Sequence, residues 1–151
     1  MSALQNKIDF VALVSVTMAN SNGDPLNGNR PRTNYDSRGE ISDVCIKRKI
    51  RNRLQDMGQC IFVQSDDRCD DGCASLRDRA EQAIKGVKDR NEYARLACEK
   101  WIDVRSFGQV FAFKEKKKGD GVSVGVRGPV SIHQALSVSP VEIESLQITK
   151  S

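Results

Sequence analysis

Residues 19–40 are rich in turn-forming residues and contain few side chains that could be buried in a core. Asparagine, glycine, aspartate, serine and proline dominate this stretch, and each of them favours turns for its own physical reason. An irregular segment of such length within a compact domain is usually functional or mobile. We therefore expect residues 19–40 to form a long functional loop.

An apolar segment precedes this loop. Residues 8–18 place Ile8, Phe10, Ala12, Val14 and Val16 on one face of an extended chain, and several residues between them are also apolar. Apolar residues on both faces predict a strand buried near the centre of a sheet. The segment is much shorter than the roughly 20 apolar residues of a membrane helix, and residues 1–10 lack the pattern of a signal peptide. We expect a cytoplasmic protein without a membrane partner.

A helix is predicted directly after the loop. Ser42 is a favourable N-cap residue, and the negative charge of Asp43 suits the positive end of a helix dipole. Gly58 provides a natural end. Four apolar residues recur at helical spacing and should form one face that anchors the helix: Ile46, Ile50, Leu54 and Met57.

The same predicted helix is strongly basic. Residues 47–53 contain five basic residues and no acidic residue, so ion pairs between residues four apart cannot explain the pattern. At about 100° per residue, Lys47, Arg48 and Arg51 should lie on one side of the apolar face. Lys49 and Arg53 should lie on the other side, and they are the weaker candidates for binding an anion.

Loop and helix together predict a nucleic-acid-binding site. Residues 29–53 contain eight basic and three acidic residues, and residues 114–118 form a second basic stretch. Backbone N–H groups of a glycine-containing loop and of a helix N-terminus can hold phosphates. A plain solvated surface, or a basic module for another acidic partner, is the alternative. The candidate RNA-binding residues are Asn22, Gly23, Asn27, Gly28, Arg30, Arg32, Ser42, Lys47, Arg48 and Arg51.

The remaining chain predicts further helices and strands, and hence an α+β protein. Residues 60–63 can form a short strand, and residues 64–104 contain an acidic loop followed by a helical insertion that Gly86 divides. Residues 103–113 are predicted to be a short apolar segment that includes a helical turn. Residues 115–121 are predicted to form a basic hinge. Residues 122–135 and 141–149 are predicted strands, the first interrupted by Gly125, Gly128 and Pro129.

Catalytic and metal-binding patterns are weak. The five cysteines (Cys45, Cys60, Cys69, Cys73 and Cys98) are expected to be reduced, and their spacing with His133 fits no zinc finger or ribbon. A ribonuclease could in principle use Asp24, Asp36 or Asp43, but no compact carboxylate cluster or partner histidine is evident. Aromatic residues make up only 5% of the chain, which argues against base stacking and favours recognition of the RNA backbone. We expect no catalytic residue, cofactor or bound metal.

Four stretches of sequence make the assignment more specific. The stretches NSNGDPLNGNRPRT at residues 20–33 and ISDVCIKRKIR at residues 41–51 resemble the backbone subunit of the type I-C CRISPR Cascade complex, a member of the RAMP superfamily. The stretches DVRSFG at residues 103–108 and VRGPVSI at residues 126–132 also resemble this family. The resemblance therefore extends over almost the whole chain.

This resemblance implies a modified RNA-recognition-motif (ferredoxin-like) fold with long insertions and a role in antiviral defence. Copies of such a subunit stack along the CRISPR RNA, beside other Cascade subunits, and present its spacer to target DNA. Related subunits of type III complexes cut RNA with a loop aspartate, so an endoribonuclease using Asp24 or Asp36 is the alternative function. Family members are roughly twice as long, which implies that residues 1–151 are a single RNA-binding domain with an incomplete fold, the N-terminal part of a longer chain.

Overall fold

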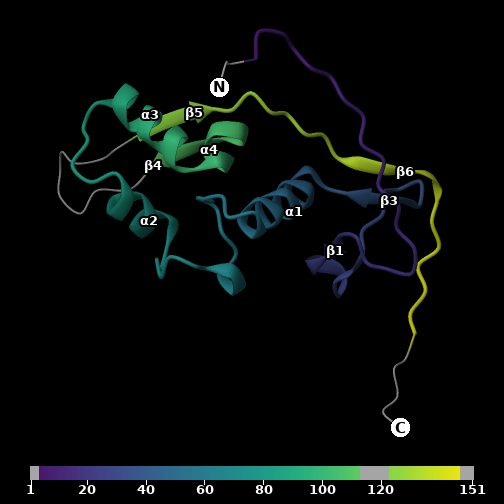
Figure 1. Ribbon diagram of the computed structural model, residues 1–151. Coiled ribbons are helices and arrows are strands. Elements are labelled where there is room, and N and C mark those ends of the chain that lie inside the picture. Colours follow the sequence, from purple (N-terminus) through teal and green to yellow (C-terminus); the bar gives the residue numbers. More distant parts are fainter. Residues whose placement is uncertain (1–3, 113–122, 147–151) are drawn as a thin grey trace. The chain divides into compact units, whose positions relative to one another are not determined.

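The computed structural model describes residues 4–112 and 123–146, and the chain divides into two compact units (Figure 1). The first unit contains residues 1–41 and 136–151, and the second contains residues 42–135. Helices and short strands follow one another along the chain, so the predicted α+β class is confirmed. Within the described residues the strands form three two-stranded sheets, β1–β2, β3–β6 and β4–β5.

In the first unit, residues 19–40 have more regular structure than a loop. Strands β1 (Gly23–Asp24) and β2 (Arg30–Pro31) pair in an antiparallel hairpin around the 3-10 helix η1 (Pro25–Asn27). The Asp24 side chain caps η1 by accepting a hydrogen bond of 3.1 Å from the Leu26 N–H. Strand β3 (Arg38–Ile41) follows and pairs with β6 (Ala135–Pro140). Local hydrogen bonds, together with the pairing of β3 with β6, therefore order a segment that has almost no core of its own.

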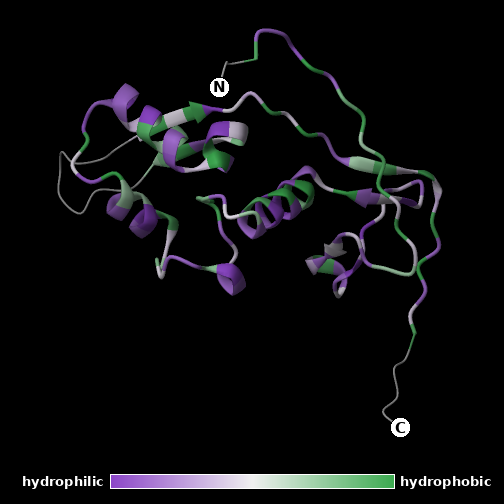
Figure 2. Cartoon of the chain, viewed as in Figure 1, coloured by the Kyte–Doolittle hydropathy of each residue, from purple (hydrophilic) through white to green (hydrophobic). Residues whose placement is uncertain are grey.

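The predicted strand at residues 8–18 is absent, and that prediction was wrong. These residues form no strand and are exposed, with Val11 and Leu13 retaining 90% and 93% of their accessible surface. Figure 2 shows the apolar residues spread along this segment. A strand is stabilised by hydrogen bonds to a neighbour and by burial of its faces. None of the described strands pairs with residues 8–18. Apolar side chains alone therefore do not make this segment a strand.

The second unit begins with the predicted helix. Helix α1 (Asp43–Asp56) starts at Ser42, whose Oγ accepts a hydrogen bond of 3.2 Å from the Cys45 N–H. Gly58 follows its end in a left-handed conformation, with φ +77°. Both local signals are the ones that the sequence provided, so this prediction is confirmed. Figure 2 shows the apolar and hydrophilic residues of α1 on different sides of the helix.

Three further helices and a hairpin complete the second unit. A short 3-10 helix η2 (Asp66–Arg68) precedes α2 (Leu76–Ala83) and α3 (Arg90–Lys100), which the chain separates at Gly86 as predicted. Helix α4 (Ile102–Phe107) leads directly into strand β4 (Gly108–Ala112). Strand β5 (Ser123–Arg127) pairs antiparallel with β4, with Gly108 opposite Arg127 and Ala112 opposite Ser123.

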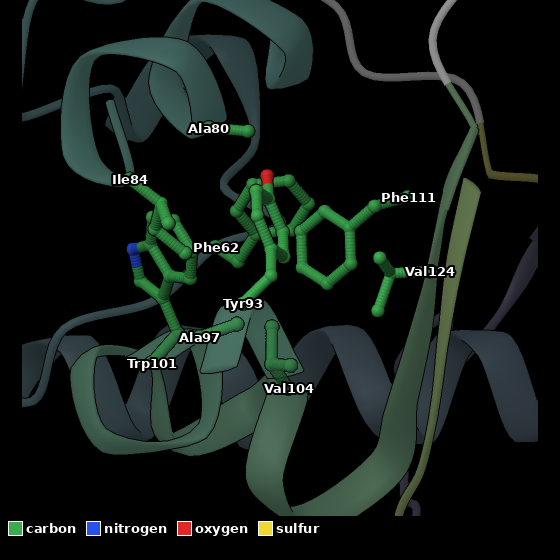
Figure 3. Packing of buried hydrophobic residues seen from close by; sticks show 9 residues of the cluster. All are labelled: Phe62, Ala80, Ile84, Tyr93, Ala97, Trp101, Val104, Phe111 and Val124. Carbon is green, nitrogen blue, oxygen red and sulfur yellow. The ribbon is translucent and has the colours of Figure 1, made fainter. Parts of the chain in front are cut away.

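An aromatic cluster forms the core of this unit (Figure 3). The Phe62 ring lies at its centre, with centroid distances of 4.7 Å to Trp101 and 5.0 Å to Phe111. Tyr93 meets Phe111 edge-on at 5.3 Å, a geometry that suits the quadrupoles of aromatic rings. Helices α2, α3 and α4 and both strands of the hairpin contribute to this cluster: Phe62, Ala80, Ile84, Tyr93, Ala97, Trp101, Val104, Phe111 and Val124.

The end of α4 and the end of β5 approach each other at two glycines. A Cβ atom on Gly128 would lie 2.2 Å from the carbonyl oxygen of Ser106, and one on Gly108 would lie 2.5 Å from the carbonyl oxygen of Val126. The Val130 N–H donates a hydrogen bond of 2.9 Å to the same Ser106 oxygen. Backbone therefore packs directly on backbone where the stretches at 103–108 and 126–132 meet.

Three other predictions on strands were wrong or only partly right. Residues 60–63 form no strand, because the N–H groups of Phe62 and Val63 donate to the Asp103 carboxylate instead of to a neighbouring strand. Of the predicted strand at 122–135, residues 123–127 form β5 and Ala135 begins β6, residue 122 lies outside the described residues, and His133 lies exposed in irregular chain. Strand β6 ends at Pro140, residues 141–146 form no strand, and residues 147–149 and the predicted hinge at 115–121 lie outside the described residues.

Candidate nucleic-acid interface

The loop part of the predicted site is the β1–β2 hairpin of the first unit. The Asn29 N–H donates to the Asp24 carbonyl oxygen at 2.8 Å, and the Arg32 N–H donates to the Asn22 carbonyl oxygen at 2.8 Å. A Cβ atom on Gly23 would lie 1.9 Å from Oδ1 of Asn29 and 3.1 Å from the Asn29 carbonyl oxygen, so a larger residue here would have to displace the Asn29 side chain. Gly28 has φ +59°, which favours glycine for a second reason. The two predicted glycines are thus explained by the hairpin itself.

The polar side chains of this hairpin differ in how far they are already engaged. Asn22 donates from its side-chain amide to the Gly23 carbonyl oxygen at 3.0 Å. Arg32 forms an ion pair of 3.1 Å with Glu40 and is thereby partly neutralised. Arg30 is exposed and forms no ion pair with any described residue, and Asn27 is exposed beside it in η1. Of the two predicted arginines, Arg30 therefore presents the less compensated charge.

The helix part of the predicted site lies in the second unit, at α1. Ser42 is occupied as the N-cap of this helix. Lys47 forms an ion pair of 3.1 Å with Asp43, one helical turn earlier. The hydrogen bond from Lys47 lowers the pKa of the Asp43 carboxyl, and the charge of the lysine acts in the same direction. The positive charge of Lys47 is therefore partly compensated within the helix.

The Arg48 and Arg51 side chains contact other residues of the second unit instead of extending into solvent. Arg48 donates from Nη1 to the Val63 carbonyl oxygen at 2.7 Å, and burial lowers its pKa. Arg51 donates from Nε to Oδ2 of Asp103 at 2.9 Å, and its guanidinium lies 5.2 Å from the centroid of the Phe107 ring. Both side chains are held by contacts that stabilise the unit, which sequence reasoning did not anticipate.

Asp103 is the centre of these contacts. Its side chain is only 1% exposed and accepts three hydrogen bonds: from Arg51 Nε, from the Phe62 N–H at 2.7 Å and from the Val63 N–H at 3.1 Å. A buried carboxylate is stable only when its charge is paired and its oxygens are hydrogen-bonded. The first residue of the DVRSFG stretch thus joins α1, the chain at 62–63 and α4.

Lys49 and Arg53 form the exposed basic side of α1. They are four residues apart, so they lie on the same face of the helix, and both are exposed. Neither forms an ion pair within the described parts of the chain. The sequence pattern ranks them below the other three cations, because it predicts that only the apolar residues of the helix are buried. The buried side also includes Arg48 and Arg51, whose partners lie far away in the sequence.

Asp24 and Asp36, the carboxylates considered for a ribonuclease, have different surroundings. Asp24 uses its side chain to cap η1, and Asp36 lies exposed with its backbone N–H bonded to the Asn34 side chain. Across residues 4–112 and 123–146, no three His, Cys, Asp or Glu side chains are grouped as metal ligands would be. What this part of the chain presents is a set of exposed cations, which suits an anionic partner. No helix among the described residues is long and apolar enough to cross a membrane.

Comparison with known proteins agrees with the resemblance of the motifs. Residues 6–151 match the family model of the CRISPR-associated protein Cas7, and the chain belongs to this family. A curated relative, the CRISPR-associated protein Cas7 of Haloferax volcanii, is 26% identical over 155 residues, which cover 91% of this chain and 44% of the relative. The chain thus spans less than half the length of that relative. The predicted family is confirmed, whereas the I-C subtype stays a prediction.

Proposed function

We propose that this protein binds CRISPR RNA, independently of base sequence, as a repeating backbone subunit of a type I CRISPR surveillance complex. The observation that carries the proposal is the match of residues 6–151 to the Cas7 family. Its partners are then the CRISPR RNA, neighbouring copies of itself, other Cascade subunits and, through the guide, the target DNA. The subunit acts in antiviral defence in the cytoplasm, as a structural component and not as an enzyme.

The charges of the described residues support recognition of the RNA backbone. Arg30, Lys49 and Arg53 are exposed and are not ion-paired within the described residues, and such cations attract phosphates whatever the bases are. Phe62, Trp101 and Phe111 pack against each other in the core, so these rings cannot stack on bases. A protein that holds any spacer needs affinity without base preference, which phosphate contacts supply.

We rank the candidate ligands by how far their charges are already paired. We assign Arg30, Lys49 and Arg53 as the leading phosphate ligands, and Arg32 and Lys47 as weaker ones because each already has a carboxylate partner. Arg48 and Arg51 contribute to binding by maintaining the position of α1. The remaining candidates supply polar or backbone groups, with Ser42 doing so at the N-terminus of α1: Asn22, Gly23, Asn27, Gly28 and Ser42.

A salt titration of RNA binding tests this assignment. Each phosphate contact with single-stranded RNA contributes about −0.7 to the slope of log K against log salt concentration, so the double variant Lys49→Ala/Arg53→Ala should flatten the slope by about 1.4. Lys85→Ala/Lys88→Ala removes two exposed charges from the segment between α2 and α3 and is the matched control. We expect this control to bind with the slope of the unaltered protein.

The titration should use two unrelated RNAs of equal length. Equal affinity for both RNAs, together with the flatter slope of the Lys49/Arg53 variant, supports binding through the RNA backbone. An unchanged slope in that variant would show that this side of α1 is a solvated surface. A large preference for one RNA would show that bases are read, and the proposed mode of binding would then be wrong.

A further inference from the structure

Two thiols, a carboxylate and a buried guanidinium meet in the turn that connects η2 to α2. The Cys69 Sγ lies 3.5 Å from the carbonyl oxygen of Cys73 and 3.5 Å from Oδ1 of Asp71. The Cys73 Sγ lies 3.9 Å from the carbonyl oxygen of Asp71. Gly72 provides a φ of +69° between them. The turn thus folds both cysteines around the same residue, Asp71.

Arg79 of α2 joins this turn to the chain at Phe62. Its side chain is 6% exposed and pairs with both carboxylate oxygens of Asp71, at 2.5 and 2.9 Å. The same guanidinium donates to the Phe62 carbonyl oxygen at 2.9 Å, and its Nη2 lies 3.5 Å from the Cys69 Sγ. The hydrogen bonds from Arg79 hold the pKa of the Asp71 carboxyl well below its usual range. Cys69 itself is exposed, whereas Cys73 is half-buried.

We propose that Cys69 and Cys73 are an oxidation site, at which a peroxide converts the two thiols into an intramolecular disulfide. The exposed Cys69 sulfur attacks one peroxide oxygen; the O–O bond breaks, a sulfenic acid forms and the leaving hydroxide departs as water with the thiol proton. The Cys73 sulfur then attacks the sulfenic sulfur, and the S–O bond breaks. The second hydroxide leaves as water with the Cys73 proton, so one peroxide is reduced to two waters.

The surroundings of the pair distinguish it from the other cysteines. Cys60 is also exposed, but it precedes the buried residues Ile61 and Phe62 and has no second cysteine within eight residues of the sequence. The guanidinium of Arg79 lies within hydrogen-bonding distance of the Cys69 sulfur, and Cys69 is the exposed member of the pair, so it is the sulfur that a peroxide reaches first. Closing the ring fixes Asp71 within a five-residue loop. Asp71 accepts hydrogen bonds from Arg79, and Arg79 in turn donates to the Phe62 carbonyl oxygen.

The sequence allows a direct test by peptide mapping of the whole protein. Trypsin cleaves after Arg68 and Arg77 and finds no site between Cys69 and Cys73, so both cysteines appear on one peptide, residues 69–77. The other three cysteines lie on separate peptides, at residues 39–47, 54–68 and 96–100. The native protein is treated with hydrogen peroxide, then denatured and alkylated without a reducing agent.

We expect the 69–77 peptide to lose two hydrogen atoms and to take up no alkyl group, while the peptide with Cys60 remains alkylated. Adding a reducing agent before alkylation should restore two alkyl groups to the 69–77 peptide. In Cys73→Ser the reaction should stop at Cys69 as a sulfenic acid that dimedone traps, and Cys60→Ser, the matched control, should form the disulfide as the unaltered protein does. Full alkylation of 69–77 after peroxide, or a link from Cys69 to a different cysteine, would overturn the proposal.

Discussion

Replacing Asp103 with alanine should destabilise the second unit more than any change on the exposed side of α1. The substitution leaves the Arg51 guanidinium, whose side chain is 13% exposed, without its carboxylate. It also leaves the N–H groups of Phe62 and Val63 without their acceptors. Breaking one side of a buried ion pair costs about 3–5 kcal/mol, and each unsatisfied buried donor costs about 1–3 kcal/mol. Because these costs overlap, we expect a loss of about 4 kcal/mol in the free energy of unfolding.

Chemical denaturation of three variants measures this loss. Arg51→Ala should also destabilise the unit, because it leaves the buried Asp103 carboxylate without its cation. Its loss should be smaller than that of Asp103→Ala, because the carboxylate keeps two backbone donors at 2.7 and 3.1 Å. Lys49→Ala, the control on the exposed side of α1, should change the free energy of unfolding by no more than about 0.5 kcal/mol. A loss below about 1 kcal/mol in Asp103→Ala would refute our view that this carboxylate joins α1 to the rest of the unit.

Three further predictions concern other parts of the chain. Labelled RNA incubated with excess protein and magnesium or manganese should stay intact, and cleavage that Asp24→Ala abolishes would establish the nuclease instead. Gly23→Ala should displace the Asn29 side chain and loosen the β1–β2 hairpin, because the new Cβ would lie 1.9 Å from Oδ1 of Asn29; amide exchange across the hairpin should become faster, and unchanged protection would contradict this. The pKa of Asp71 is lowered by its hydrogen bonds from Arg79, so its contribution to stability is complete above its ordinary pKa of 3.8 and is lost as the pH falls below that value. Acid denaturation should therefore depend less steeply on pH in Asp71→Asn, and identical profiles would contradict the linkage.

Local signals made α1 predictable. The Ser42 cap, the helical spacing of the apolar residues and the glycine at 58 all lie within the segment that they organise. The strand expected at residues 8–18 depends instead on a partner strand, and no pattern within a segment specifies its partner. Residues 60–63 failed as a strand for a related reason, because Asp103, about 40 residues later, takes the N–H groups of Phe62 and Val63.

The candidate site shows the same division between local and distant causes. The sequence identified a basic helix after a glycine-containing loop; the helix exists, and the structure shows the β1–β2 hairpin within that loop. It did not identify which side of the helix faces solvent, because the contacts that turn Arg48 and Arg51 inward are made with Val63 and Asp103. The exposed cations Lys49 and Arg53 were visible in the sequence, but only the position of those distant acceptors distinguishes them from their neighbours.

The close approach of Gly108 and Gly128 has a consequence for how variants of this protein can arise. Side-chain crowding in a core can be relieved by a smaller neighbour, but here the atoms that a new Cβ would meet belong to the backbone of Ser106 and Val126. No exchange of another side chain can remove a carbonyl oxygen. The two glycines therefore admit no compensating second-site substitution, and a library that randomises residues 103–108 and 126–132 should recover glycine at both positions, whatever side chains it accepts around them.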